Sequence, residues 1–343
     1  MRITFIPKFN GSCQPSADDF VWALGYSCER RHPVTPSIRA EEGTIMGQMI
    51  KLQGIFPPLP TPFTAADMLD VEALSSHVSF LASAGVHGVV VLGSNGEAVH
   101  LDSNEQQQMI RSVRALLPAH TVIAGCSALS TRRTLTQTQQ AAESGADAAL
   151  ILPPHYYRAQ MSLDALLRYY TTVADASPLP VIVYNMPSCT GMDLDTDLLA
   201  QLSHHPNIHG VKDSSGDAGK LARLVQESQL GFQILAGSAG FLLPALALGC
   251  TGGVPALANI APQECLEIYA LSQKGDWARA RQIQVRLAAV NHAVTRRWGV
   301  AGLKAAMDLL GLRGGPVRAP LQPLSHQEIE TLRQLLVASQ ILC

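Results

Sequence analysis

The sequence predicts a closed (β/α)8 barrel, or TIM barrel, with a C-terminal helical appendage. From residue 53 onward, short runs rich in β-branched residues alternate with amphipathic stretches, the pattern of repeated βα units around a parallel sheet. Eight such runs precede residue 260, and a barrel of this class is built from eight strands. The same units also build an open, doubly wound sheet, but the strand count favours the closed barrel.

Each expected strand is a short apolar run bounded by turn residues or by a change to polar sequence. The eight runs lie at 54–58, 88–92, 121–125, 146–152, 181–184, 208–212, 233–236 and 252–255. Amphipathic helices are expected between them, for example at 71–83 and at 104–117. The second of these helices follows Ser103, whose spacing to Gln106 suits a capping box.

After the eighth run the strand signal ends and helical patterns take over. They lie at 261–273, 276–295, 302–310 and 325–339. Because one barrel does not need so many helices, we expect a barrel domain at 51–260 and a helical domain at 261–343. A stiff connector, Pro316-Val-Arg-Ala-Pro320, lies within the helical part, since its two prolines fix their own φ angles.

Residues 1–50 differ in composition from the rest of the chain. They are irregular and mixed in charge, and they lack the apolar segment of a secretory signal. A mitochondrial presequence would be poor in acidic residues, whereas Asp18 and Glu29 dilute the positive charge here. We expect a disordered extension or an over-extended start, with Met46 or Met49 as the initiator. The expected location is cytoplasmic, with the mitochondrial matrix as the alternative.

Composition points to an enzyme-sized protein with a small-molecule substrate. With 343 residues and 47% hydrophobic content, the chain is able to bury a large core. The formal net charge of -2 and the scattered Lys and Arg give no basic face for nucleic acid or for an acidic membrane surface. The seven cysteines are widely spaced and form no C-x-x-C pair, which favours a reducing compartment and indicates no structural zinc site.

Three expected strand ends carry groups suited to catalysis. One strand ends on Lys212 and another on Tyr184, while the strand at 88–92 runs into the turn Gly93-Ser-Asn-Gly96. The N–H groups and small side chains of such a turn suit a carboxylate. In a (β/α)8 barrel the carboxyl ends of the strands form the active site. Taken singly, these features also fit a solvated lysine, a strand-end aromatic and an ordinary tight turn.

Together the three groups fit amine catalysis. A lysine attacks a ketone only when deprotonated, and burial or a neighbouring cation favours that form. The resulting iminium withdraws electrons, so a neighbouring carbon–carbon bond is able to break without a metal. A tyrosine is a suitable carrier for the proton of the substrate hydroxyl. The loop histidines His204, His205 and His209 lack a metal-ligand spacing, so a metal-dependent aldolase ranks low, and we expect no metal or cofactor.

With these residues the chain resembles the superfamily of Schiff-base aldolases and lyases that includes dihydrodipicolinate synthase and N-acetylneuraminate lyase. The resemblance runs from about residue 52 to the C-terminal helices. It implies a homotetrameric barrel with a helical C-terminal domain and a small 2-oxo acid as substrate. The motifs that carry it are Pro60-Thr-Pro-Phe63, Gly93-Ser-Asn-Gly-Glu97, Tyr156-Tyr157, Tyr184-Asn-Met-Pro187 and Gly210-Val-Lys-Asp213.

The resemblance also implies roles for individual residues. Lys212 matches the Schiff-base lysine, Tyr184 the proton-shuttling tyrosine, and Ser94 the hydroxyl that links this tyrosine to a second one. Tyr156 best matches the second tyrosine, which a neighbouring subunit lends in the family, and the adjacent Tyr157 leaves that register open by one residue. Substrate contacts are implied for Ser94, Asn95, Ser214 and Gly237.

Within the superfamily the chain most resembles the 4-hydroxy-2-oxoglutarate aldolases, through stretches such as Ala236-Gly-Ser-Ala-Gly-Phe-Leu242 and Gly314-Gly-Pro-Val-Arg-Ala-Pro-Leu321. Dihydrodipicolinate synthases use an arginine for a substrate carboxylate where this chain has Cys189. We therefore expect a class I aldolase that cleaves 4-hydroxy-2-oxoglutarate, or a related 2-oxo acid, to pyruvate and an aldehyde such as glyoxylate. The alternatives are dihydrodipicolinate synthase, a sugar-acid aldolase and, from another class, a catalytically silent pyruvate-binding regulator.

Overall fold

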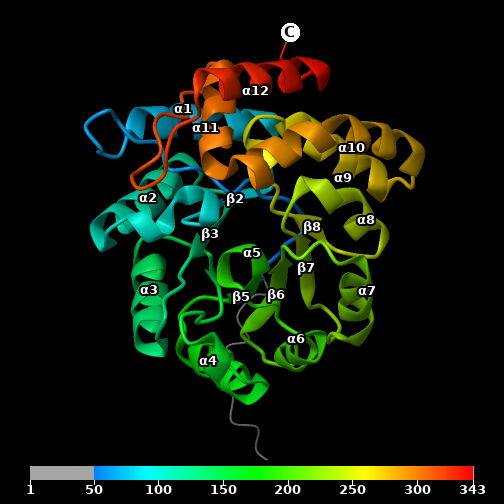
Figure 1. Ribbon diagram of the computed structural model, residues 1–343. Helices are drawn as coiled ribbons and strands as arrows, with labels where there is room; N and C mark the ends of the chain where they lie inside the picture. The colour runs from blue at the N-terminus through cyan, green and yellow to red at the C-terminus, as the bar shows by residue number, and fades with distance from the viewer. Residues whose placement is uncertain (1–49, 343) are drawn as a thin grey trace, which may run out of the picture. The chain divides into compact units, whose positions relative to one another are not determined.

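The strands form one continuous parallel sheet. The computed structural model describes residues 50–342, and within them eight strands follow the order β1-β8-β7-β6-β5-β4-β3-β2 (Figure 1). They are β1 (Gly54–Ile55), β2 (Gly88–Val91), β3 (Thr121–Gly125), β4 (Ala148–Ile151), β5 (Val181–Asn185), β6 (Ile208–Asp213), β7 (Gln233–Ala236) and β8 (Gly252–Gly253). Every predicted strand is present. The extension predicted for residues 1–50, with Met46 and Met49, lies outside the described residues except for Ile50.

Hydrogen bonds close the sheet into a barrel. β1 pairs in parallel with β8, with Gly54 opposite Gly252. The segment after β1 pairs with β2, since Leu59 N donates to Val90 O at 2.8 Å and Val90 N donates to Pro57 O at 2.9 Å. The predicted (β/α)8 barrel is therefore confirmed, and the open, doubly wound alternative is wrong.

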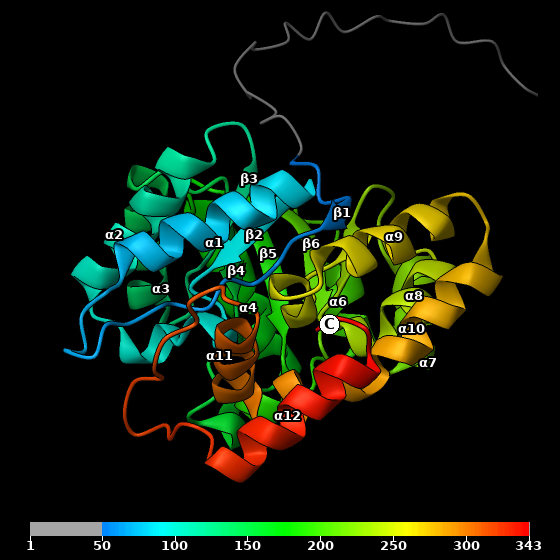
Figure 2. The same cartoon turned by 90° about the horizontal axis from the view of Figure 1, so that it is seen from above.

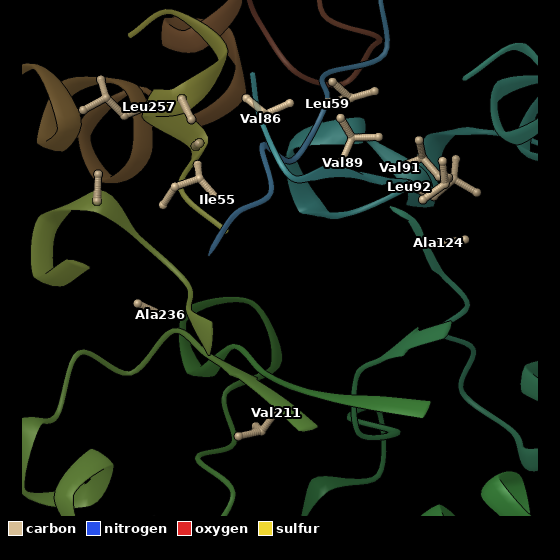
Figure 3. Packing of buried hydrophobic residues seen from close by; sticks show 14 of the residues in the cluster. Ile55, Leu59, Val86, Val89, Val91, Leu92, Ala124, Val211, Ala236 and Leu257 are labelled. Atoms are coloured by element: carbon tan, nitrogen blue, oxygen red, sulfur yellow. The ribbon is translucent and has the colours of Figure 1, made fainter. Parts of the chain in front are cut away.

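Alternation along the strands separates two apolar cores. Because successive side chains of a strand point to opposite faces, one set fills the barrel and the other packs under the helices. Figure 3 shows members of the outer set, including Val89, Val211 and Ala236, with side chains turned away from the middle of the barrel. The inner set is Leu52, Phe56, Val90, Ile123, Ala148, Leu150, Ile182, Tyr184, Leu235 and Val254.

Helices connect the strands and cover the barrel. They are α1 (Val71–Ala84), α2 (Ser103–Leu116), α3 (Thr131–Glu143), α4 (Leu163–Ala176), α6 (Thr196–Leu202), α7 (Ala218–Glu227), α8 (Leu242–Ala247) and α9 (Pro262–Gln273). The single turn α5 (Pro187–Thr190) follows β5. α9 packs against both α8 and α1, so the ring of helices is closed as well (Figure 2).

An acidic or hydroxyl side chain caps the start of most of these helices. At α2 the prediction of Ser103 as the cap is wrong by one residue. The cap is Asp102, which accepts from Asn104 N at 2.8 Å and Glu105 N at 2.9 Å. Glu105 accepts in return from Asp102 N, which completes a capping box.

Further helices follow α9. They are α10 (Trp277–His292), a π-helical turn (Ala293–Arg297), α11 (Gly299–Leu309) and α12 (His326–Ala338), drawn in orange and red in Figure 1. α11 packs against η1, a turn of 3-10 helix (Ser94–Gly96) that follows β2. The C-terminal helices thus contact the turn that the sequence singles out for carboxylate binding. No helix between residues 50 and 342 is long and apolar enough to cross a membrane.

Candidate active site

Lys212 and Tyr184 meet inside the carboxyl end of the barrel. They are register partners on the neighbouring strands β6 and β5, so both side chains leave the sheet on the same face. Lys212 Nζ lies 4.0 Å from the centroid of the Tyr184 ring. Only 3% of Lys212 and 4% of Tyr184 are exposed, so the amine and the phenol ring are shielded from bulk water.

The turn after β2 brings Ser94 to the same place. Ser94 Oγ lies 3.4 Å from the Tyr184 hydroxyl, within hydrogen-bond distance. Gly96 N donates to Gly93 O at 2.9 Å and Glu97 N donates to Ser94 O at 3.3 Å, which closes the turn on itself. Among the described residues the N–H groups of Ser94 and Asn95 have no backbone acceptor, so they remain able to bind a ligand.

Ser214 and Gly237 meet on the other side of Lys212. Gly237 N donates to Asp213 O at 2.7 Å, which draws the end of β7 against the end of β6. A Cβ on Gly237 would lie 1.9 Å from Ser214 Oγ, so only glycine fits this close approach. Within residues 50–342, Ser214 Oγ is buried and has no hydrogen-bond partner. A buried hydroxyl in this condition is suited to a ligand.

A polar network behind the strand ends was not predicted from the sequence. Asn185 Nδ2 donates to Asp213 Oδ2 and to Asp193 Oδ1, each at 2.7 Å. Lys220 Nζ pairs with Asp193 and lies 3.5 Å from Asp213 Oδ2. Since Asn185 and Asp213 directly follow Tyr184 and Lys212, the network fixes the two strands on which the central pair stands. In the sequence, this network is indicated only by the polar residues Asn185 and Asp213 at the ends of two apolar strands.

A cavity of about 750 Å³ opens at the carboxyl ends of β2 to β5. Ser94 and Tyr184 line it together with Ser127, His155 and the exposed Cys189. Its size is sufficient for a small organic substrate. Of the predicted site residues, Ser94 and Tyr184 line the cavity, and the buried Lys212 does not.

Tyr156 does not join this group within the single chain. It is 72% exposed, and its ring packs edge-on against Tyr157 with centroids 5.0 Å apart. The described residues contain no contact between Tyr156 and Tyr184. The role predicted for Tyr156 requires a second copy of the chain, so it stays a prediction.

One histidine of the supposed loop cluster is in fact part of the sheet. His209 lies on β6 and is 9% exposed, and its Nδ1 accepts from Ile50 N at 3.3 Å. Burial lowers the pKa of His209. His205 remains near the surface, where its Nε2 lies 3.0 Å from Asp175 Oδ1. These contacts give His209 and His205 structural roles.

A buried ion pair beside the turn was also missed. Glu97 ends the Gly93-Ser-Asn-Gly96 turn, and Lys304 of α11 donates to its Oε1 at 2.6 Å. Burial lowers the pKa of the Lys304 ammonium, and the adjoining carboxylate opposes that shift. The lysine on the otherwise apolar face formed by Leu303, Ala306 and Met307 is a sequence signal that could have revealed a buried charge.

Comparison with known proteins agrees with this geometry. Residues 51–339 match the model of the dihydrodipicolinate synthetase family. A 4-hydroxy-tetrahydrodipicolinate synthase of Methanospirillum hungatei is 36% identical over 83% of this chain and 98% of its own length. A probable mitochondrial 4-hydroxy-2-oxoglutarate aldolase of Emericella nidulans is 37% identical, over 82% of this chain and 93% of its own.

Solved structures agree as well. A chloride-inhibited dihydrodipicolinate synthase from Acinetobacter baumannii, complexed with pyruvate, superposes with a TM-score of 0.81 at 30% identity. The match covers 85% of this chain and 100% of that one. The family model and the relatives together show that the chain belongs to the dihydrodipicolinate synthetase family.

Proposed function

We propose that this protein is a class I aldolase that cleaves 4-hydroxy-2-oxoglutarate, or a closely related 2-oxo acid, to pyruvate and an aldehyde such as glyoxylate. The observation that carries the proposal is the buried Lys212 amine, 4.0 Å from the centroid of the Tyr184 ring. An amine held beside a phenol at the end of a barrel strand is placed to attack the carbonyl of a bound 2-oxo acid. Family membership supports the same kind of chemistry.

The proposed reaction begins with imine formation. Lys212 Nζ attacks C2 of the 2-oxo acid, and loss of water leaves an iminium. Tyr184 removes the proton of the C4 hydroxyl, the C3–C4 bond breaks, and its electron pair moves into the iminium to give an enamine. The aldehyde leaves, C3 takes up a proton, and water hydrolyses the iminium to release pyruvate. Ser94, 3.4 Å from the Tyr184 hydroxyl, is the proposed next group in the proton path.

The proposed carboxylate site lies between two strand ends. The N–H groups of Ser94 and Asn95 and the hydroxyl of Ser214 are donors without a protein partner in the described residues. Such donors bind the C1 carboxylate of a 2-oxo acid. The Acinetobacter baumannii relative was solved in complex with pyruvate, which supports a 2-oxo acid as the ligand of this chain. Tyr156, exposed here, is proposed to complete the proton path of a second copy in a homotetramer.

Cys189 favours the aldolase over the synthase. It lines the cavity beside Tyr184 at the position where dihydrodipicolinate synthases use an arginine for a substrate carboxylate. A charged hydrogen bond contributes about 1.5 to 3 kcal/mol, so its absence weakens selection of aspartate semialdehyde by roughly one to two orders of magnitude. The second candidate is nevertheless 4-hydroxy-tetrahydrodipicolinate synthase, the name carried by the Methanospirillum hungatei relative.

A comparison of two reactions on one preparation tests the proposal. We expect kcat/KM for cleavage of 4-hydroxy-2-oxoglutarate, followed by the release of pyruvate, to exceed kcat/KM for condensation of pyruvate with aspartate semialdehyde. Condensation faster by about tenfold or more would replace the aldolase with the synthase. Absence of both reactions, with pyruvate still bound, would instead indicate a pyruvate-binding regulator.

A further inference from the structure

The side chain of Glu97 joins the active-site turn to the C-terminal helices. Its Oε1 accepts from Lys304 Nζ at 2.6 Å, and its Oε2 accepts from Arg318 N at 2.9 Å. His100 Nδ1 lies 3.4 Å from the same Oε2. The side chains of Glu97 and Lys304 are each only 1% exposed. The ion pair is therefore shielded from solvent and bridges residues 207 positions apart in the chain.

The backbone of the turn is held in an unusual conformation at both ends. Leu92 has φ of 57° and Glu97 has φ of 51°, the left-handed region that residues other than glycine rarely adopt. Such conformations persist where surrounding contacts impose them, and they concentrate at functional sites. At Glu97 the imposing contacts are the two charge-assisted hydrogen bonds of its carboxylate. Between the two strained residues stand Ser94 and Asn95, whose N–H groups have no backbone acceptor among residues 50–342.

The same pair also controls the charge beside the turn. Without a counter-ion, the buried carboxylate of Glu97 would repel a ligand carboxylate bound to the N–H groups of Ser94 and Asn95. Lys304 supplies the counter-ion, and its Nζ is further held by Pro316 O at 2.8 Å and lies 4.4 Å from the ring centroid of Phe63. The ammonium thus donates to two protein acceptors, and we assign it this structural role rather than that of a nucleophile.

We propose that Glu97 and Lys304 are positioning residues that set the affinity of the Ser94–Asn95 turn for the carboxylate of the 2-oxo acid. They hold the two N–H groups in place, and they cancel the charge that would repel the ligand. This inference rests on the proposed function, since it assigns the turn to the substrate carboxylate. It also gives the C-terminal helices a part in substrate recognition through α11.

Two ketones separate carboxylate recognition from imine formation. Pyruvate carries the carboxylate, whereas acetone keeps the reacting ketone and lacks it. Borohydride trapping of each ketone on Lys212, over a range of concentrations, gives the concentration for half-maximal labelling. In Lys304→Met we expect that concentration to rise about ten- to a hundredfold for pyruvate and to stay unchanged for acetone. In the double variant Lys304→Met/Glu97→Gln, which removes both charges, we expect most of the affinity for pyruvate to return.

The controls make each outcome decisive. Glu227→Gln makes the same chemical change as Glu97→Gln in an exposed ion pair on α7, and should behave as the wild type. Equal changes for both ketones in Lys304→Met, or no change for either, would overturn the inference. If Lys304→Met does not fold, Lys304→Gln provides the same comparison, because it removes the positive charge and keeps a hydrogen-bond donor for Glu97. A wild type that fails to label with pyruvate would refute the proposed function itself, and this inference with it.

Discussion

At the scale of single residues, removal of the Tyr184 hydroxyl tests the proposed proton transfer. Phenylalanine at this position keeps the ring beside Lys212 Nζ and deletes only the group that faces Ser94. Positioned acid–base groups contribute on the order of 10² to 10⁴ in rate. We therefore expect Tyr184→Phe to lower turnover by about that factor while Lys212 still forms an imine with pyruvate.

Steady-state turnover and borohydride trapping on the same variant check this expectation. Tyr269→Phe, on α9 and away from the site, is the matched control. A turnover of Tyr184→Phe close to that of the wild type would mean that the proton passes through another group, with water or Tyr157 the first candidates.

The central residues were predictable because each interrupts a local pattern. Lys212 and Tyr184 lie where an apolar strand changes to polar sequence. In a barrel of parallel strands, these two carboxyl ends lie at the same end of the barrel. No sequence pattern indicates that Glu97 and Lys304 form a pair. One ends a glycine turn and the other lies on an apolar helix face, and only the fold brings them within 2.6 Å.

At the scale of secondary-structure elements, a buried histidine links α1 to the segment after β8. His77 Nε2 lies 3.0 Å from Asn259 Oδ1, while Nδ1 is buried with no partner in the described part of the chain. Burial lowers the pKa of His77 from 6.5 to about 4, and the hydrogen bond to Asn259 opposes the shift. The unfolded chain therefore binds the proton more readily than the folded protein.

This difference predicts how stability depends on pH. The contribution of neutral His77 is fully present above pH 6.5 and is lost as the pH falls from there towards about 4. Its full size is on the order of 3 kcal/mol, because the pKa falls from 6.5 to about 4 and a tenfold change in proton affinity corresponds to about 1.4 kcal/mol. Urea unfolding at pH 7.5 and at pH 5 should show a smaller loss of stability in His77→Gln than in the wild type. The surface variant His204→Gln should match the wild type, and identical losses in all three proteins would contradict the assignment.

The bounds of the elements were predictable to within a few residues. Strands such as β3 and β5 are continuous apolar runs between turn residues, so burial on both faces sets their type and length. The N-cap of α2 was misplaced by one residue because Asp102 and Ser103 are adjacent and both suit a cap. Only the backbone conformation at Asp102 decides between them.

At the scale of the whole molecule, α11 packs against the turn that we propose binds the substrate carboxylate. Arg318 lies in the connector between α11 and α12. Its guanidinium donates to the Glu105 carboxylate at 2.8 Å and to His100 O at 2.9 Å, so it binds the connector to the segment after β2. The two prolines of Pro316-Val-Arg-Ala-Pro320 predicted a stiff connector, but not its target. That contact depends on how α11 crosses the barrel, which no local pattern encodes.

The barrel as a whole places one amine in a shielded position beside a phenol, near the turn that we propose binds the substrate carboxylate. The central claim is therefore that Lys212 forms a covalent imine with a 2-oxo acid. Peptide mapping after borohydride treatment in the presence of pyruvate tests it most directly. We predict a 1-carboxyethyl group on the peptide that contains Lys212, and none in Lys212→Ala, with Lys274→Ala labelled as the wild type. Labelling on Lys304, or no labelling of the wild type at all, would contradict the account.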